Sequence, residues 1–548
     1  MQWQLLSSEV PKNIDEIKSI LLKNRSVTDE VEFFNPTNPR DFSAEAVGIN
    51  GAQLKKAVER IKLAHTQTQH VVIFGDYDAD GICATAILWR ALRAYGLVAD
   101  PFIPRRDTHG YGISKKALDE IVAKKKPDLI ISVDNGIVAH EALAYAQEIG
   151  IDVIVTDHHQ PEKDGVEFVF PPAVAVVHTT KLCGSTVSWM LAREFSVESA
   201  LEDLDLAAIA TIADQVLLQG FNRGFAVHGL KVLSMSRKTG IKALAELANV
   251  DLSQVNCRTV GYTLAPRINA MGRLAHGMDA LRLLCTKSWE TARKLARLLD
   301  TTNTDRQEMT MDQYDIAVQQ VKLQMEESVL VVHSDKFHEG VIGLIAGRLV
   351  EQFGKPAIVL SVNELTAKGS ARSIPSINIV ELLRLVREDL LEVGGHPMAA
   401  GLGVVKEKIE VIKSKLFTLA KETVTAEMLV PKIQVDMELP HSMLNIQTAE
   451  SLAAFDPFGS GNPEPLFAVN DMMITGVQTI GKEGKHLKLQ LEADGQKLEA
   501  LAWGKGDTAQ SYSNGQVVSA AIMISVNEWK NKKRLQVVAR DILTVGQA

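Results

Sequence analysis

The segment VVIFGDYDADG (71–81) decides the fold class, because a short apolar run leads directly into an acidic turn that ends in glycine. Two later segments, LIISVDNG (129–136) and VIVTDHH (153–159), have the same arrangement. Stretches with helical spacing at 82–95 and 114–125 alternate with the apolar runs, which is the β-α-β rhythm of a parallel sheet. We therefore expect an α/β fold that begins with a parallel-sheet domain.

The polar clusters at these three strand ends should meet in space, because ligands bind beyond the carboxyl ends of parallel strands. Crowded carboxylates repel each other, and divalent cations are the usual remedy. Oxygen ligands with one or two imidazoles and no thiolate favour Mn²⁺ or Mg²⁺ over zinc. An extended DYDAD segment would place its three aspartates on one side, which suits two adjacent ions. The predicted cluster consists of Asp76, Asp78, Asp80, Asp134, Asp157, His158 and His159.

Each cluster also has a purely structural interpretation. The DxD segment alone would serve as a loop or helix cap, VDNG as a turn, and the histidine pair as part of the packing. The metal hypothesis is stronger because three separate strand ends carry potential ligands for the same type of hard cation.

Composition limits the class of protein. The chain has 548 residues, 46% of them apolar and 23% charged, which indicates three or four folded domains. The formal charge of −8 is not typical of a nucleic-acid-binding protein. Any polyanion would therefore have to bind at local basic patches. The four cysteines show no disulfide or zinc spacing, and the sequence has neither a signal peptide nor a membrane-spanning apolar run. We expect a cytoplasmic protein without membrane association.

Changes of pattern along the chain predict its domains. Residues 1–45 have no clear period and are expected to pack on, or lead into, the first domain. The expected units are an extension at 1–45, a catalytic domain at 46–284, a connecting helix at 285–327, a second α/β domain at 328–428 and an all-β domain at 429–548.

The motifs DYDADG (76–81), VDNG (133–136) and TDHH (156–159), in this order, resemble the first motifs of the DHH phosphoesterase family. Within that family, the later motifs resemble the RecJ group, bacterial exonucleases that degrade single-stranded DNA from the 5′ end. Those motifs are GYTLAPRINAMGRL (261–274), HEGVIGLIAGRL (338–349), KGSARSIP (368–375), GGHPMAAG (394–401) and FDPFGSGNPEPLF (455–467). The resemblance implies a DHH domain joined by a long helix to a smaller DHHA1-type domain, followed by an OB-like domain.

The resemblance also implies roles for single residues. Asp134 would bridge two ions, His159 would contact the scissile phosphate, and Asp157 would orient its neighbours as part of the catalytic set. The implied metal ligands are Asp76, Asp78, Asp80, Asp134, His158 and Asp214.

Several residues are candidates for binding the strand. Arg267, Asn269 and Arg273 lie in a stretch broken by proline and glycine, although such arginines also pair with surface acids. Trp529 begins WKNKKR (529–534), which is either a stacking site with adjacent cations or a solubilising hairpin turn. The resemblance adds a 5′-phosphate pocket and further strand contacts, formed by Arg106, Ser370, Arg372, Arg348 and His396.

Two segments depart from the family pattern. ADQVLL (213–218) stands where the family has ADVVPL, so the loop after Asp214 lacks its usual proline. His178 and Thr179 replace the usual Asn-Pro, and CGSTVSW (183–189) replaces a glycine-rich continuation. These changes lie beside the implied ligands and are expected to affect substrate fit or rate.

The predicted function is hydrolysis of single-stranded DNA to 5′-mononucleotides by a two-metal, 5′-to-3′ exonuclease of recombination and repair. One alternative is a related phosphodiesterase of short oligonucleotides or cyclic dinucleotides, against which the OB-like region argues. A second alternative is a non-catalytic single-strand-binding scaffold, against which the retained ligands argue. A helicase and a single-strand-binding protein are candidate partners, and a monomer is expected.

Overall fold

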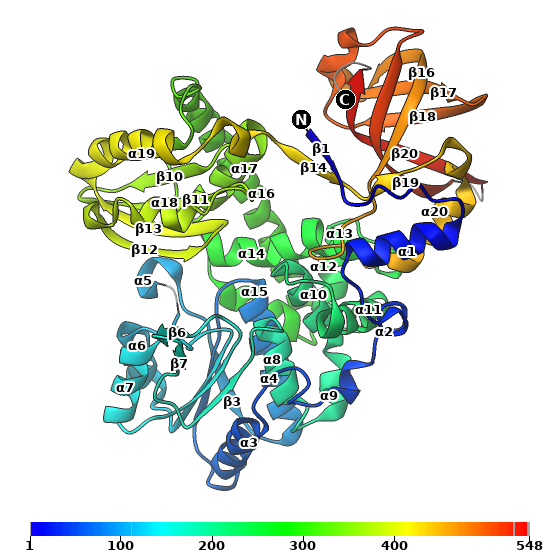
Figure 1. Cartoon of the computed structure of the whole chain (residues 1–548). Coiled ribbons are helices and arrows are strands. Elements are labelled where there is room, and N and C mark those ends of the chain that lie inside the picture. Colours follow the sequence, from blue (N-terminus) through cyan, green and yellow to red (C-terminus); the bar gives the residue numbers. More distant parts are fainter. Residues whose placement is uncertain (1, 111, 530–531, 545–548) are drawn as a thin grey trace.

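The computed structural model describes residues 2–110, 112–529 and 532–544, which form three sheet-containing units around a helical centre (Figure 1). The first unit has a five-stranded sheet in the order β3-β2-β4-β5-β8, and all neighbouring strands are parallel. The expected α/β class with a parallel sheet is therefore confirmed. Its strands are β2 (Val71–Phe74), β3 (Ala99–Phe102), β4 (Leu129–Val133), β5 (Asp152–Asp157) and β8 (Ala175–His178).

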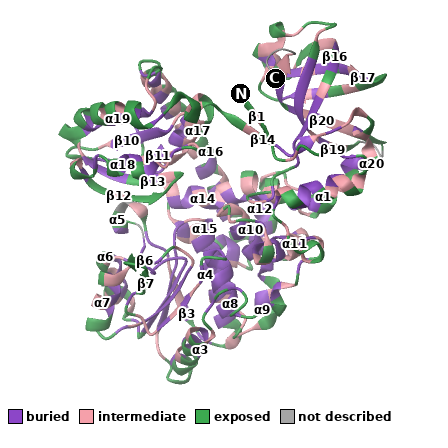
Figure 2. Ribbon diagram, in the orientation of Figure 1, coloured by how far each residue is buried: buried purple, intermediate pink, exposed green. Residues whose placement is uncertain are grey.

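Helices cover both faces of this sheet, so its strands are mainly apolar, and β2 (VVIF) is apolar throughout. Val71 and Ile73 of β2 face one core, and Val72 and Phe74 face the other, as the alternation of a strand requires. The first face carries α3 (Gly51–Thr66), α4 (Ala79–Tyr95) and α8 (Gly184–Ala192), and the second carries α6 (Lys115–Lys125) and α7 (His140–Glu148). Figure 2 shows much of this sheet buried.

Helices follow the first sheet and form the centre of the molecule. They are α9 (Val197–Glu202), α10 (Leu204–Ala213), α11 (Gly220–Ser234), α12 (Thr239–Leu247), α13 (Cys257–Thr259), a π-helical turn at Val260–Leu264, α14 (Ala265–Leu274) and α15 (Gly277–Cys285). The long connecting helix implied by the sequence is α16 (Trp289–Val321), which has 33 residues.

The second unit has a mixed five-stranded sheet in the order β12-β13-β11-β10-β9, in which only the β9–β10 pair is parallel. Its strands are β9 (Leu330–Ser334), β10 (Ala357–Val362), β11 (Thr366–Arg372), β12 (Leu390–His396) and β13 (Ala399–Val405), and its helices are α17 (Ile342–Phe353), α18 (Ile379–Arg384) and α19 (Ile409–Thr423).

The third unit is a closed barrel, because β16 pairs with β19 as well as with β17. Closure removes the exposed sheet edges, which is the arrangement of an OB fold. Its strands are β16 (Phe467–Ile480), β17 (His486–Ala493), β18 (Gln496–Ala502), β19 (Val517–Trp529) and β20 (Lys532–Thr544). In the part of the chain that the structure describes, no helix has the length and apolarity needed to cross a membrane.

The beginning of the chain packs mainly on the barrel, so the expectation that it packs on the first domain is only partly correct. β1 (Gln2–Leu5) pairs in parallel with β14 (Lys432–Val435), which precedes the barrel. The apolar face of α1 (Ile14–Asn24) completes the barrel core. Among residues 2–49, only the segment from Phe42 to Ile49 joins the core of the first domain. The sequence showed no clear period in this region, so it did not indicate that the barrel covers α1.

Candidate metal centre

The register of the parallel sheet brings three aspartates to one level at its carboxyl edge. Phe74 pairs with Ser132, and Val133 pairs with Thr156. One or two residues further on, the same register aligns Asp76, Asp134 and Asp157, all of which are buried. The predicted convergence of the strand ends is therefore present in the structure.

The DYDAD segment does not have the extended conformation considered from the sequence, because helix α4 begins within it. The side chain of Asp78 accepts a hydrogen bond from the Gly81 N–H at 3.0 Å and caps α4, whose first turn contains Asp80. Gly81 is required here, since a Cβ would lie 2.6 Å from the backbone nitrogen of Asp76. The turn directs the three carboxylates into two different groups.

Asp80 is held by the N-terminus of α8. Its carboxylate accepts hydrogen bonds from the N–H groups of Gly184 and Ser185, both at 2.7 Å, and the Ser185 hydroxyl donates to the Asp80 carbonyl oxygen. The N–H groups of this helix N-terminus therefore hold the Asp80 side chain in one orientation. The segment CGSTVSW, which departs from the family pattern, therefore begins a helix that orients a candidate ligand.

Three sets of side chains have ligand atoms within 4.8 Å of one another, close enough to share an ion. Two of them, Asp76 with Asp78 and Asp134, and Asp80 with His158 and Asp214, have no member in common, and the third, Asp134 with His158 and His159, overlaps both. His158 Nε2 connects the two sets, because it lies 3.3 Å from Asp134 Oδ1 and 3.8 Å from Asp214 Oδ2. Asp134 therefore lies where a bridging ligand between two ions is needed.

The carboxyl groups carry the electrostatic signature of a cation site. Burial and the charges of the neighbouring aspartates raise the pKa of Asp134 well above its ordinary value. Burial and the charge of Asp78 raise the pKa of Asp76 to about 8, and burial and the charge of Asp80 raise that of Asp214 to about 8. Within the described residues, the buried Asp134 Oδ1 makes no hydrogen bond. These residues fit two hard divalent cations, whose charge would hold the carboxylates ionised.

The residues of the TDHH motif have different roles: His158 is a candidate metal ligand, and Asp157 orients His159. Burial lowers the pKa of His158, which keeps its imidazole in the neutral, metal-binding form. Asp157 accepts a hydrogen bond from His159 Nδ1 at 2.7 Å and others from the N–H groups of Ile137 and His158. Burial alone lowers the pKa of His159, but this bond and the charges of the surrounding aspartates outweigh it and raise the pKa to about 9.

We expect Gly184→Ala to raise the dissociation constant of Mn²⁺ at least about tenfold. The added Cβ would lie 2.2 Å from Asp134 Oδ1, so the carboxylate must leave its position. Calorimetric titration of the metal-free protein with Mn²⁺ measures the change. Gly347→Ala in α17 is the matched control, because its Cβ would meet nothing within 4 Å. Unchanged Mn²⁺ affinity in the Gly184 variant would contradict the placement of Asp134.

Two of the candidate strand-binding residues are already engaged within the protein. Arg267 donates from Nε to Asp300 at 2.9 Å and from Nη1 to the Thr263 carbonyl, which matches the ion-pair alternative considered for it. The side-chain oxygen of Asn269 accepts a hydrogen bond from the Ala79 N–H at 2.7 Å. Asn269 therefore braces the acidic turn from α14.

Three other arginines, Arg106, Arg306 and Arg372, lie near Arg273. Burial and the charges of Arg106 and Arg306 lower the pKa of Arg273 to about 10. The charge of Arg372 adds to this decrease, whereas the charge of Asp78 opposes it. Arg106 stacks 4.5 Å above the ring of Tyr77. Mutual repulsion of these half-buried guanidinium groups is relieved by an anion such as a phosphate. Arg306, in the middle of α16, belongs to no motif, so the sequence offered no signal for it.

The second unit contributes the other predicted anion contacts. Arg372, at the end of β11, donates to Ser370 Oγ at 3.0 Å, and both side chains lie against Gly343 in the first turn of α17. Arg348 of α17 contacts the Met311 sulfur, and His396 is exposed at the end of β12. The side chain of Trp529 and residues 530–531 lie outside the described part of the chain.

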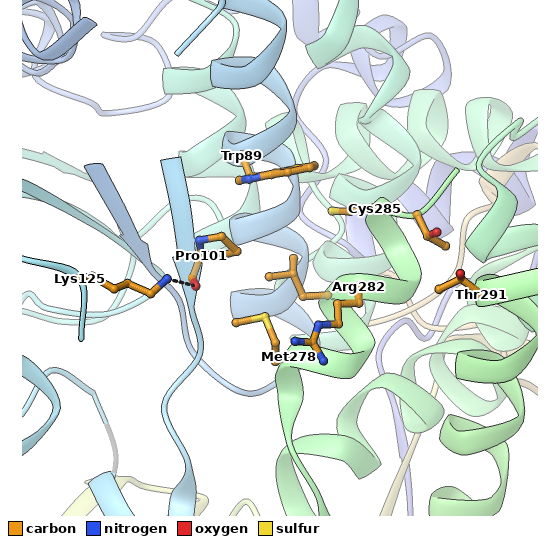
Figure 3. A pocket seen from close by; sticks show the side chains of 9 residues that line it. Trp89, Pro101, Lys125, Met278, Arg282, Cys285 and Thr291 are labelled. Atoms are coloured by element: carbon orange, nitrogen blue, oxygen red, sulfur yellow. Dashed lines mark hydrogen bonds between the residues drawn. The ribbon is translucent and has the colours of Figure 1, made fainter. Parts of the chain in front are cut away.

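A cavity of about 480 Å³ lies away from the acidic cluster (Figure 3). Its walls come from α4, β3 and α15, and the side chains that Figure 3 labels include Trp89, Met278 and Cys285. No candidate site residue lines it. The metal centre is therefore identified by its ligands, whereas this apolar cavity has no part in the predicted chemistry.

The fold and the centre define a protein of the DHH class with added DHHA1 and OB domains. Residues 70–217 match the N-terminal domain of the DHH family, residues 326–422 match the DHHA1 domain, and residues 435–541 match the RecJ OB domain. The single-stranded-DNA-specific exonuclease RecJ of Bacillus subtilis is 35% identical over 96% of this chain and 67% of its own length. RecJ of Escherichia coli is 30% identical over 89% of this chain and 90% of its own length. The chain therefore belongs to the RecJ family.

Solved structures agree with this assignment. RecJ of Thermus thermophilus in complex with Mn²⁺ has a TM-score of 0.83 and 30% identity, covering 99% of this chain and 79% of that one. The Mg²⁺ complex of the same protein has a TM-score of 0.77 and 27% identity, with coverage of 99% and 78%. The expected order of domains, with a DHH unit, a long helix, a DHHA1-type unit and an OB unit, is confirmed.

Proposed function

We propose that this chain is a metal-dependent exonuclease that hydrolyses single-stranded DNA from the 5′ end and releases 5′-mononucleotides. The observation that carries the proposal is the position of Asp134, which belongs to two of the three ligand sets, close to a group of partly buried arginines. The phosphate of a phosphodiester carries one negative charge and two ester oxygens. Such a group fits a cationic surface next to a pair of metal ions. The named relatives are single-stranded-DNA-specific exonucleases, which supports the proposed substrate.

In this proposal, Asp76 and Asp78 would hold one ion, Asp80, His158 and Asp214 would hold the other, and Asp134 would serve both. Two bound Mn²⁺ or Mg²⁺ ions would polarise the phosphoryl oxygens, lower the pKa of the attacking water and stabilise the leaving oxygen.

The other residues position the strand. His159, oriented by its hydrogen bond to Asp157, contacts the scissile phosphate. Arg106, Ser370 and Arg372 bind the terminal phosphate, and the N-terminus of α17 adds its partial positive charge. A pocket that accepts one chain end accounts for stepwise cleavage from the 5′ side.

The proposal is tested by a time course with Mn²⁺ on a single-stranded oligonucleotide labelled at its 3′ end, with its duplex run in parallel. Stepwise shortening of the labelled single strand alone is the expected result. Immediate release of labelled mononucleotide would mean that the enzyme cuts from the 3′ end instead. Preference for dinucleotides over long strands would favour the small-substrate phosphodiesterase, and binding without cleavage would favour the scaffold.

We expect Arg372→Ala to weaken binding of 5′-phosphorylated single strands by roughly 10- to 100-fold, because it removes a charge-assisted bond to the terminal phosphate. Fluorescence anisotropy in Ca²⁺ with 5′-phosphorylated and 5′-hydroxyl strands measures the difference. Arg384→Ala, exposed on α18, is the matched control. An equal loss of affinity for both kinds of strand would contradict the phosphate pocket.

The same proposal places the enzyme in the cytoplasm as a monomer acting in recombination and repair. The four cysteines form no disulfide, as suits a reducing compartment. A nuclease specific for single strands needs duplex to be opened and the released strand to be presented, so a helicase and a single-strand-binding protein are the proposed partners.

A further inference from the structure

The DPFGSGNPEP segment (456–465) has no role in the chemistry described above, yet it reaches the helical centre (Figure 1). Its Ser460 carbonyl accepts a hydrogen bond from the Leu218 N–H at 2.7 Å. Leu218 is four residues beyond the candidate metal ligand Asp214, in the connection between α10 and α11. We propose that this segment of the C-terminal unit is a positioning element that fixes Asp214 for metal binding.

The connection from α10 to α11 needs such support, because its backbone turns twice. Gln215 has a φ of 57° and Gly220 a φ of 49°, so the chain adopts the left-handed conformation on both sides of the contact. Non-glycine residues are rare in that region, and a surrounding structure must hold them there. The family's usual proline in this loop is replaced by Leu217, which packs against Gly461, while Leu218 packs against Gly459. The two glycines leave room for the two leucines.

The segment is itself rigidly held. Asn462 is fully buried and donates from Nδ2 to the carbonyls of Phe455 and Pro457. The buried guanidinium of Arg223, on α11, donates to the carbonyls of Phe455 and Asp456, the latter at 2.7 Å. Arg25 donates from Nε to the Asn462 side chain. A firmly bonded loop of one unit therefore meets the loop that carries a ligand of another.

Gln219 offers the side-chain contact through which the inference is tested. Its Nε2 donates to the Gly461 carbonyl at 2.8 Å and to the Arg25 carbonyl at 3.2 Å. Gln219→Glu keeps the shape of the side chain but places carboxylate oxygens against two carbonyls. The contact between residues 456–465 and the loop after α10 should weaken, and Asp214 should lose its fixed position beside Asp80 and His158.

The inference rests on the proposed two-metal function, but its test needs no DNA. In calorimetric titration of the full-length, metal-free protein with Mn²⁺, Gln219→Glu should raise the dissociation constant of one of two ions about tenfold. Asn24→Ala is the matched control, because Asn24 also makes two side-chain hydrogen bonds at the barrel, to the carbonyl and side chain of Asp436. That variant should retain the Mn²⁺ affinity of the parent protein. Gln219→Lys, which keeps N–H donors, should restore most of the affinity.

A double-mutant cycle separates positioning from general loss of stability. If Gln219 acts through Asp214, Gln219→Glu adds no further loss of Mn²⁺ affinity to Asp214→Asn. Equal affinity of Gln219→Glu and the parent protein, or additive losses in the double variant, would overturn the inference. Two Mn²⁺ ions bound by a parent protein that cuts no DNA would overturn the proposed function and leave this inference standing.

Discussion

Replacing Asp134 with asparagine should reduce strand cleavage at least about 10³-fold while the protein stays folded. Asp134 belongs to the set with Asp76 and Asp78 and to the set with His158 and His159, so the loss of its negative charge should weaken both ion sites. Asparagine is the suitable replacement, because Asp134 has a φ of 61° and asparagine tolerates this left-handed region. An alanine would add backbone strain to the loss of a ligand.

The rate of mononucleotide release with saturating Mn²⁺ measures this effect, and circular dichroism checks the fold. Asp494→Asn is the matched control, since Asp494 also has a positive φ, of 51°, but lies in the turn between β17 and β18. Its activity should equal that of the parent protein. A folded Asp134→Asn protein with near-normal turnover would refute the assignment of the bridging ligand.

Removal of the metal should make the stability of the protein fall as the pH rises. The pKa values of Asp76 and Asp214 lie near 8 in the folded chain and near 4 in the unfolded chain. The folded state therefore binds protons more tightly, and the stability that they provide is complete below about pH 4 and is lost as the pH rises through about 8. We expect the melting temperature in EDTA to fall by at least about 5 °C between pH 5 and pH 8.

Mn²⁺ should reverse this trend, because it replaces the protons and binds the ionised carboxylates. The stabilisation by Mn²⁺, measured as the difference in melting temperature from the EDTA sample, should be small at pH 5 and large at pH 8. Asp214→Asn serves as the control and should show a smaller fall in EDTA. A stabilisation by Mn²⁺ that did not change with pH would contradict the raised pKa values.

The sequence allowed the meeting of the three strand ends to be predicted, because parallel strands must bring their carboxyl ends to one edge. It did not show the local path of DYDAD. The same residues are compatible with an extended segment or with a helix cap. The hydrogen bond from the Gly81 N–H to the Asp78 side chain stabilises the helix cap. The division of the ligands into two sets follows from that bond.

Contacts made between distant segments were beyond the reach of sequence patterns. Arg306 lies in a helix rich in charged residues, and only the packing of the first and second units brings it to Arg273. Likewise, the support of Asp80 by Gly184 and Ser185 depends on the approach of two helices 104 residues apart in the chain. A pattern of residue types records the chemistry of a side chain but not its distant partner.

The pairing of β1 with β14 and the packing of α1 on the barrel affect how the protein is made. The indole of Trp3 donates a hydrogen bond to Asp541, a partner 538 residues further along the chain. At a translation rate of about 5–20 residues per second, the first segment waits roughly half a minute to two minutes for its partner. During synthesis, the apolar face of α1 remains exposed on the ribosome and is a target for chaperones. Residues 2–24 are thus synthesised long before the barrel strands on which they pack.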